Sequence, residues 1–132
     1  MTNRPIANAF NITNKQGAGA EWNEVGAAFP HNDGNGFNIP LEVIPSTSKI
    51  TLRYNHTLGE SALRTQALIA YAVISRGQTT FWRPIGTATP HADNKGHTLD
   101  VFAYPKDGNI VVRAFKEDRI ATPDVDQEVE AA

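Results

Sequence analysis

WNEVGAAFPHNDGNG at residues 22–36 and WRPIGTATPHADNKG at residues 82–96 share the pattern Trp-x-x-x-Gly-x-Ala-x-Pro-His-x-Asp-x-x-Gly. The two stretches lie 60 residues apart, and the same offset relates identical residues on both sides of them. Repetition at a fixed spacing indicates two similar substructures that bury their apolar faces against each other. The identical pairs are Gly17/Gly77, Trp22/Trp82, Gly26/Gly86, Ala28/Ala88, Pro30/Pro90, His31/His91, Asp33/Asp93, Gly36/Gly96, Pro45/Pro105, Ile50/Ile110 and Arg53/Arg113.

Each copy is predicted to contain four strands. Residues 37–44 and 49–54 alternate apolar and polar side chains, which is typical of a half-buried strand. The predicted fold is therefore mainly β, with two tandem four-stranded antiparallel units related by a pseudo-twofold axis and one or two short helices at most. The predicted strands are 8–13, 21–29, 37–44, 49–54, 69–75, 79–89, 97–104 and 109–115.

The 132 residues suit a single domain, 1–132, made of the two repeats. Its predicted parts are repeat 1 at about 8–54, a linker at 55–68, repeat 2 at about 69–115 and an acidic tail at 117–132. Residues 57–66 form either a short helix or only a linker. In the tail, Thr122 and Pro123 are favourable first residues of a helix, and a disordered acidic segment is the alternative.

The composition excludes several kinds of site and of targeting segment. The absence of cysteine excludes disulfides, thiolate zinc sites and a cysteine nucleophile. Residues 1–9 lack the apolar core of a signal peptide, and no apolar stretch is long enough for a membrane helix. We therefore expect a cytoplasmic protein with no membrane partner, either a monomer built as a pseudo-dimer or a homo-oligomer.

The net charge of −2 is unevenly distributed. Residues 117–132 hold six acids and one base, a net of −5, so the remaining residues carry 11 bases and 8 acids, a net of +3. Within the repeats, 17–54 has a net of −2 and 77–114 a net of +1. An anionic ligand is therefore expected at the second copy, and the acidic tail is expected to compete for that surface or to recruit a partner protein.

The Pro-His-x-Asp turns admit two readings. A joint metal site of His31, Asp33, His91 and Asp93 would require the two turns to converge. We favour the other reading, in which each turn only connects two strands, because the spacing matches no established ligand motif. No metal and no cofactor is therefore predicted.

The repeated large side chains are also open to two readings. We expect Trp22 and Trp82 to be core anchors, with base-stacking platforms as the alternative. Arg53 and Arg113 either form a symmetric pair at one ligand groove or make local salt bridges with an acid such as Glu42 or Asp100. His56 and His97 have no partner motif and are expected at the surface or at an edge.

Aromatic residues interleaved with bases favour binding of single-stranded nucleic acid, because bases stack on aromatic rings and basic side chains follow the phosphates. The alternative is a sheet whose aromatics are buried, in a protein-interaction module such as an inhibitor or assembly factor that binds through a sheet face or an edge strand. The sequence holds no nucleophile elbow, phosphate loop or paired carboxylates, so a non-enzymatic role is expected. The predicted nucleic-acid-binding residues are Arg53, Arg76, Arg83, Arg113, Lys116, Tyr71, Phe81 and Tyr104.

The repeated unit, followed by an alternating strand, a proline turn and Ile-x-x-Arg, resembles a group of small proteobacterial proteins that are often plasmid-borne or associated with mobile elements. Those proteins carry the unit once, whereas this chain carries it twice. The second copy departs from the pattern at Pro84, Asn94 and His97, which suggests that the two copies have different roles. The predicted order of elements is also similar to the Whirly type of single-strand-binding architecture.

Overall fold

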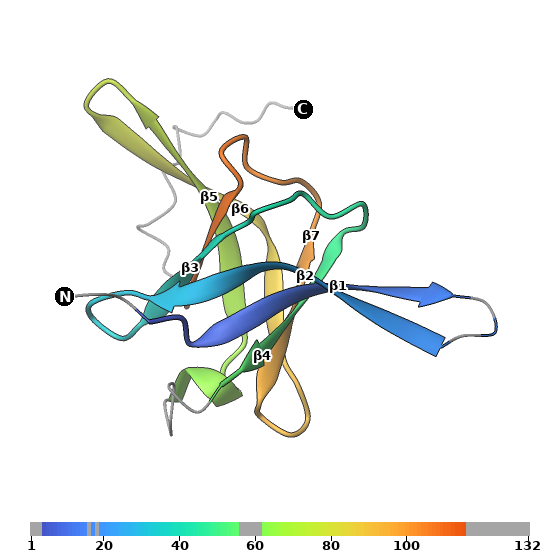
Figure 1. The fold of residues 1–132 in the computed structure, drawn as a ribbon. Coiled ribbons are helices and arrows are strands. Elements are labelled where there is room, and N and C mark those ends of the chain that lie inside the picture. The colour runs from blue at the N-terminus through green and yellow to red at the C-terminus, as the bar shows by residue number, and fades with distance from the viewer. Residues whose placement is uncertain (1–3, 16, 18, 56–61, 116–132) are drawn as a thin grey trace.

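The structure, a computed structural model, describes residues 4–15, 17, 19–55 and 62–115. Its strands form one closed antiparallel barrel in the order β1-β2-β3-β8-β5-β6-β7-β4, with β4 pairing back to β1 (Figure 1). The elements are β1 (Ala7–Lys15), β2 (Gly19–Pro30), β3 (Gly36–Pro40), β4 (Lys49–Tyr54), the 3-10 helix η1 (Ala62–Thr65), β5 (Leu68–Arg76), β6 (Thr79–Pro90), β7 (Gly96–Val101) and β8 (Asn109–Arg113). The mainly β fold is thus confirmed.

The barrel consists of two four-stranded halves that pair with each other along two seams. Within the first repeat the strands lie in the order β3-β2-β1-β4, and within the second in the order β7-β6-β5-β8. Strand β3 pairs with β8, and β4 pairs with β7. The last strand of each repeat therefore completes the other repeat, so the two halves share one barrel.

The first hairpin of each repeat extends beyond the barrel, and the two hairpins point in different directions (Figure 1). In the first, three residues connect Lys15 to Gly19, whereas two residues connect Arg76 to Thr79 in the second. The equivalent residues of β1 and β5 are consequently 61 positions apart, although those of β2 and β6 are 60 apart. Phe10 thus corresponds to Tyr71, an equivalence that a constant offset of 60 conceals.

The core lies inside the barrel and follows the two-residue period of the strands. Phe37 and Ile39 on β3 and Ile50 and Leu52 on β4 are fully buried, as are Leu99, Ile110 and Val112 on β7 and β8. Alanines occupy inward positions of β1 and β2 and of their counterparts β5 and β6, so the interior combines small and large side chains as a narrow barrel requires. The fully buried alanines are Ala7, Ala9, Ala28, Ala70 and Ala88.

Gly26 and Gly86 lie at a β-bulge that both repeats share. The register shifts between Ala9 and Phe10 in the first hairpin and between Ala70 and Tyr71 in the second. The next strand passes so close that a Cβ on Gly86 would lie 2.1 Å from the Asp100 carbonyl oxygen. The repeated glycine is therefore required by the close approach of two backbones.

Several sequence predictions need correction. The strand predicted at 37–44 ends at Pro40, since Leu41 makes a single bridge to Gly26 before the chain turns away. Likewise β7 ends at Val101 and β8 at Arg113. The prediction that the tryptophans anchor the core is wrong. Trp22 is 49% exposed and packs edge-on against Phe10 on the projecting hairpin. Trp82 is only partly buried and packs edge-on against Tyr71.

Candidate functional site: two seam turns and a basic groove

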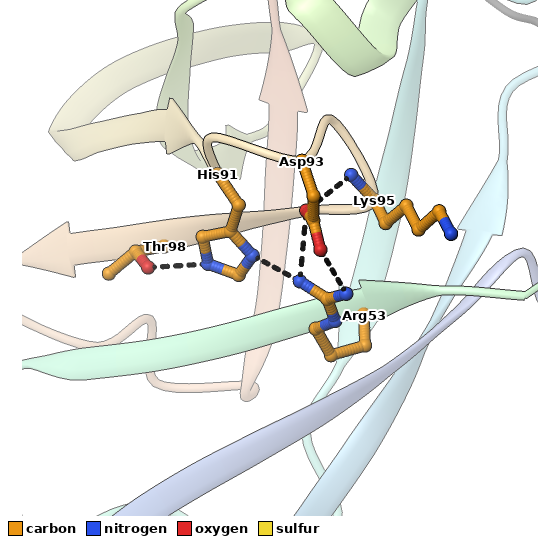
Figure 2. A network of polar contacts seen from close by, with 5 residues as sticks. All are labelled: Arg53, His91, Asp93, Lys95 and Thr98. Carbon is orange, nitrogen blue, oxygen red and sulfur yellow. Dashed lines mark hydrogen bonds and ion pairs between the residues drawn. The ribbon is translucent and has the colours of Figure 1, made fainter.

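The Pro-His-x-Asp turn of each repeat is bound by the arginine of the other repeat. Arg53 on β4 reaches across the seam to the turn between β6 and β7 (Figure 2). Its Nη2 donates to Asp93 Oδ2 at 2.9 Å, and its Nη1 donates to His91 Nδ1 at 2.8 Å. A guanidinium can only donate, so His91 Nδ1 accepts, and Nε2–H donates to Thr98 Oγ1 at 2.8 Å. The contact fixes both the tautomer and the plane of the imidazole.

The other seam has the same arrangement. Arg113 Nη2 donates to Asp33 Oδ2 at 2.6 Å, and Nη1 donates to His31 Nδ1 at 2.7 Å. His31 Nε2 lies 2.8 Å from Asn38 Oδ1, in the position that Thr98 occupies at the first seam. We call each set of arginine, histidine and aspartate a seam clamp. Of the two predictions for the arginines, the structure has the salt bridges. Arg53 pairs with Asp93 and Arg113 with Asp33, rather than with Glu42 or Asp100.

Both aspartates also shape their own turn. Asp33 Oδ1 accepts the Asn35 amide at 2.9 Å, and Asp93 Oδ1 accepts the Lys95 amide at 2.9 Å. The hydrogen bonds from arginine, followed by those from the backbone amides, lower the pKa of each carboxyl to about 2. Burial, followed by the positive charge of Arg53, lowers the pKa of His91. At neutral pH each clamp therefore holds an ionised carboxylate.

The glycine that follows each turn has no room for a side chain. A Cβ on Gly36 would lie 2.4 Å from Arg113 Cγ, and one on Gly96 would lie 2.5 Å from His91 Nδ1. Gly34 and its counterpart Asn94 both have positive φ, 75° and 59°. Asparagine adopts this conformation more readily than most residues, which explains why the two copies can differ there.

The clamps do not form a joint metal site. Within the described residues, no group of three or more histidine, aspartate or glutamate side chains lies close enough to hold a metal ion. His31, Asp33, His91 and Asp93 are instead used in pairs, each facing an arginine.

His97 is fully buried, so the expectation of a surface position is wrong. Its Nε2 donates to the Gln66 carbonyl at 2.7 Å, and its Nδ1 accepts from the Tyr54 hydroxyl at 2.6 Å. Burial lowers the pKa of His97 and raises that of Tyr54. The seam between β3 and β8 has Phe37 and Ala114 at the equivalent positions, so this polar pair distinguishes the β4–β7 seam from the other.

A groove of about 650 Å³ lies on the second repeat, between the β5–β6 hairpin and the loop that joins β7 to β8. Its charged residues are Arg76, Arg83, Lys106 and Asp107, which give a net of +2. The loop is attached to β6 by the bond from the Phe102 amide to the Ile85 carbonyl, at 2.9 Å. We call this site the basic groove.

Aromatic rings line or border the basic groove. Phe102 is 80% exposed. The Tyr104 hydroxyl donates to the Thr47 carbonyl at 2.6 Å, and this bond holds the tyrosine ring against the loop between β3 and β4. The Arg76 guanidinium lies 5.5 Å from the centre of the Phe81 ring. The groove and its border therefore contain both cations and aromatic rings.

The structure does not bring all the predicted binding residues together. Arg76, Arg83 and Tyr104 line the groove, and Phe81 contacts Arg76. Arg53 and Arg113 belong to the seam clamps. Tyr71 is fully buried, so the prediction that it stacks on a base is wrong. Lys116 and the acidic tail at 117–132 lie outside the described residues.

Phe102 and Lys106 are not among the predicted binding residues, although both differ between the two copies. The first repeat has Glu42 and Ser46 at the equivalent positions. The second copy thus has an aromatic residue in place of an acid and a base in place of a hydroxyl. Both differences favour binding of an anion by the second copy.

The helix that the structure describes, η1, is four residues long, and no helix in the described ranges is long and apolar enough to cross a bilayer. A scan against models of protein families, a search of curated proteins and a search of solved structures each returned no match to this chain.

Proposed function

We propose that this chain is a cytoplasmic, non-enzymatic protein of a bacterial mobile element that binds single-stranded nucleic acid with little sequence preference. The observation that carries the proposal is the basic groove, in which three cations and two exposed or partly exposed rings line one surface of the second repeat. Arg76, Arg83 and Lys106 contact phosphates, while Phe102 and Tyr104 stack on bases.

The exposed ring and the cations on both walls of the groove favour a single strand over a duplex. Base stacking on aromatic rings contributes about 1–3 kcal/mol per base, and it requires the base faces that a duplex conceals. Phe102, at 80% exposed, offers a ring face to solvent. The cations lie on both walls of the groove, Arg76 and Arg83 on the hairpin and Lys106 on the loop, so a backbone between them is contacted from two sides.

The test is a titration with oligothymidylate followed by tryptophan fluorescence at several salt concentrations. Each lost phosphate contact reduces the salt slope by about 0.7 for a single strand, so R83A/K106A is expected to flatten it by about 1.4 and to weaken binding on the order of tenfold at low salt. The matched control is K49A/K95A, which removes the same charge outside the groove.

Two outcomes oppose the proposal. An absence of binding at about 50 mM salt, where phosphate contacts are strong, would remove it. Equal losses of affinity in R83A/K106A and K49A/K95A would show that net charge, and not the groove, attracts the strand. A duplex of the same length, titrated in parallel, measures the preference for single strands.

A second candidate is a protein-interaction module. The observation that favours it is the exposure of Val43 and Ile44, at 56% and 54%, on the loop between β3 and β4. Adjacent apolar side chains that both remain exposed form a small patch of the kind through which proteins bind one another.

A further inference from the structure

The surface of the first repeat that corresponds to the basic groove is acidic and aliphatic. Residues 11–15, 23–25 and 42–47 are the counterparts of 72–76, 83–85 and 102–107, and their net charge is −1 against +2. The loops are attached in the same way, since the Glu42 amide donates to the Val25 carbonyl at 2.8 Å just as Phe102 bonds to Ile85. We call this surface, formed by Glu24, Glu42, Val43 and Ile44, the acidic face.

We propose that the acidic face of one molecule docks into the basic groove of a second copy of this chain. The inference does not depend on nucleic-acid binding, although both ligands would use the same groove. Opposite charge on the two surfaces is the main argument: Glu24 and Glu42 face the partner's cations, in the way that complementary potentials direct association between proteins.

Apolar contact supplies the second argument. Val43 and Ile44 are more than half exposed, and the Ile44 side chain extends towards Gly108, 3.9 Å from the position of a Cβ there. The groove offers Pro84, Ile85 and Phe102 as apolar lining. Docking would cover both apolar surfaces at once, and burial of such area is favourable at about 25 cal/mol per Å².

The geometry makes this contact heterologous, because the two surfaces that meet are different. Each molecule carries one acidic face and one basic groove, so every association leaves a free surface of each kind unless a ring closes. The expected result is a mass that grows with concentration and falls as salt screens the charges. A polyanionic strand that binds the groove displaces the partner molecule.

The experiment is sedimentation of the full chain at low and moderate salt, with two charge-reversal variants. E24K/E42K makes both surfaces basic, and R83E/K106E makes both surfaces acidic. Each variant alone is expected to stay monomeric at concentrations on the order of 100 µM, at which the wild-type chain associates. Mixing the two variants restores opposite charges and is expected to restore the complex.

Circular dichroism and the Tm show that each variant is folded, and restored association in the mixture shows that both surfaces are intact. A wild-type chain that stays monomeric at low salt overturns the proposal, as does a mixture that fails to associate. E24K/E42K leaves the groove unchanged, so its binding of oligothymidylate reports on the nucleic-acid proposal alone. The two proposals therefore fail separately.

Discussion

Arg113 in the last strand holds Asp33, a residue 80 positions earlier in the turn before β3, with Nη2 and Oδ2 2.6 Å apart. The equivalent pair, Arg53 and Asp93, closes the other seam at 2.9 Å. The residues that the two copies share most visibly therefore act between copies. Since the turn of one repeat and the strand end of the other form each contact, the motif is explained by barrel closure.

Replacing Arg113 by lysine is expected to lower the Tm by several degrees. Lysine keeps the charge but loses the two-pronged geometry that binds Asp33 and His31 together. R53K is expected to have a smaller effect, because the Arg53 side chain is 34% exposed and that of Arg113 is 15% exposed. Differential scanning calorimetry measures both, with R83K in the groove as a control. An R113K protein as stable as wild type would contradict a structural role for the clamp.

Gly36→Ala is expected to destabilise the fold by about 1–3 kcal/mol, the usual cost of overpacking a tight site. The new Cβ would lie 2.5 Å from the Val112 carbonyl oxygen, and backbone cannot move aside cheaply. Gly34→Asn two residues earlier is the control: the second repeat already holds Asn94 at φ 59°, so the expected change is below about 1 kcal/mol. Urea denaturation gives both values, and equal losses would refute the distinction.

Stability is expected to fall as the pH drops below about 6.5 because of His97. Burial lowers its pKa below the ordinary value of 6.5, so the unfolded chain takes up the proton first. The contribution is therefore complete above pH 6.5 and is lost as the pH falls towards the lowered pKa. His91, whose pKa is also lowered, acts in the same direction.

His97→Phe is expected to remove part of this pH dependence. At neutral pH it should cost about 1–3 kcal/mol, since the Tyr54 hydroxyl and the Gln66 carbonyl lose their partner. Tyr54→Phe is the matched variant: it removes one hydrogen bond but keeps the histidine, so the pH dependence stays. Tm measured from pH 5 to pH 8 separates them, and an unchanged slope in H97F would exclude His97 as the source.

A second loss of stability is expected in acid, from the seam clamps. The pKa values of Asp33 and Asp93 fall from 3.8 to about 2 on folding, so their contribution is complete above about pH 4 and disappears as the pH falls towards 2. D33N/D93N should be less stable at pH 6 and should lose less between pH 4 and pH 2. Urea midpoints across that range measure the difference, and parallel curves for the two proteins would oppose the assignment.

The fold class was predictable because half-buried strands alternate apolar and polar side chains with a period of two residues. The alternation at 49–54 gave the bounds of β4 as the structure has them, Lys49–Tyr54. The strand at 37–44 was overextended because Leu41 and Val43 continue the alternation after Pro40, where pairing has ended. Periodicity reports which side chains alternate, but it contains no information on where a neighbouring strand stops.

The site was predictable only in part, for a related reason. The charge difference between the copies pointed to the second repeat, and Arg76, Arg83 and Tyr104 do line one groove. The partners of Arg53 and Arg113 were missed because they come from the other repeat, through pairings of β4 with β7 and of β3 with β8. A repeat read by itself does not reveal contacts that exist only between repeats.

The two seams have a consequence for how the chain can change over time. Neither half has a closed sheet alone, so a substitution in either clamp weakens the edges of both halves, and the clamp residues are under a joint constraint. Residues in the loops and hairpins away from the seams do not have this constraint. The two similar halves thus form one shared barrel with two separate surfaces, so residues on one surface can change without altering the other.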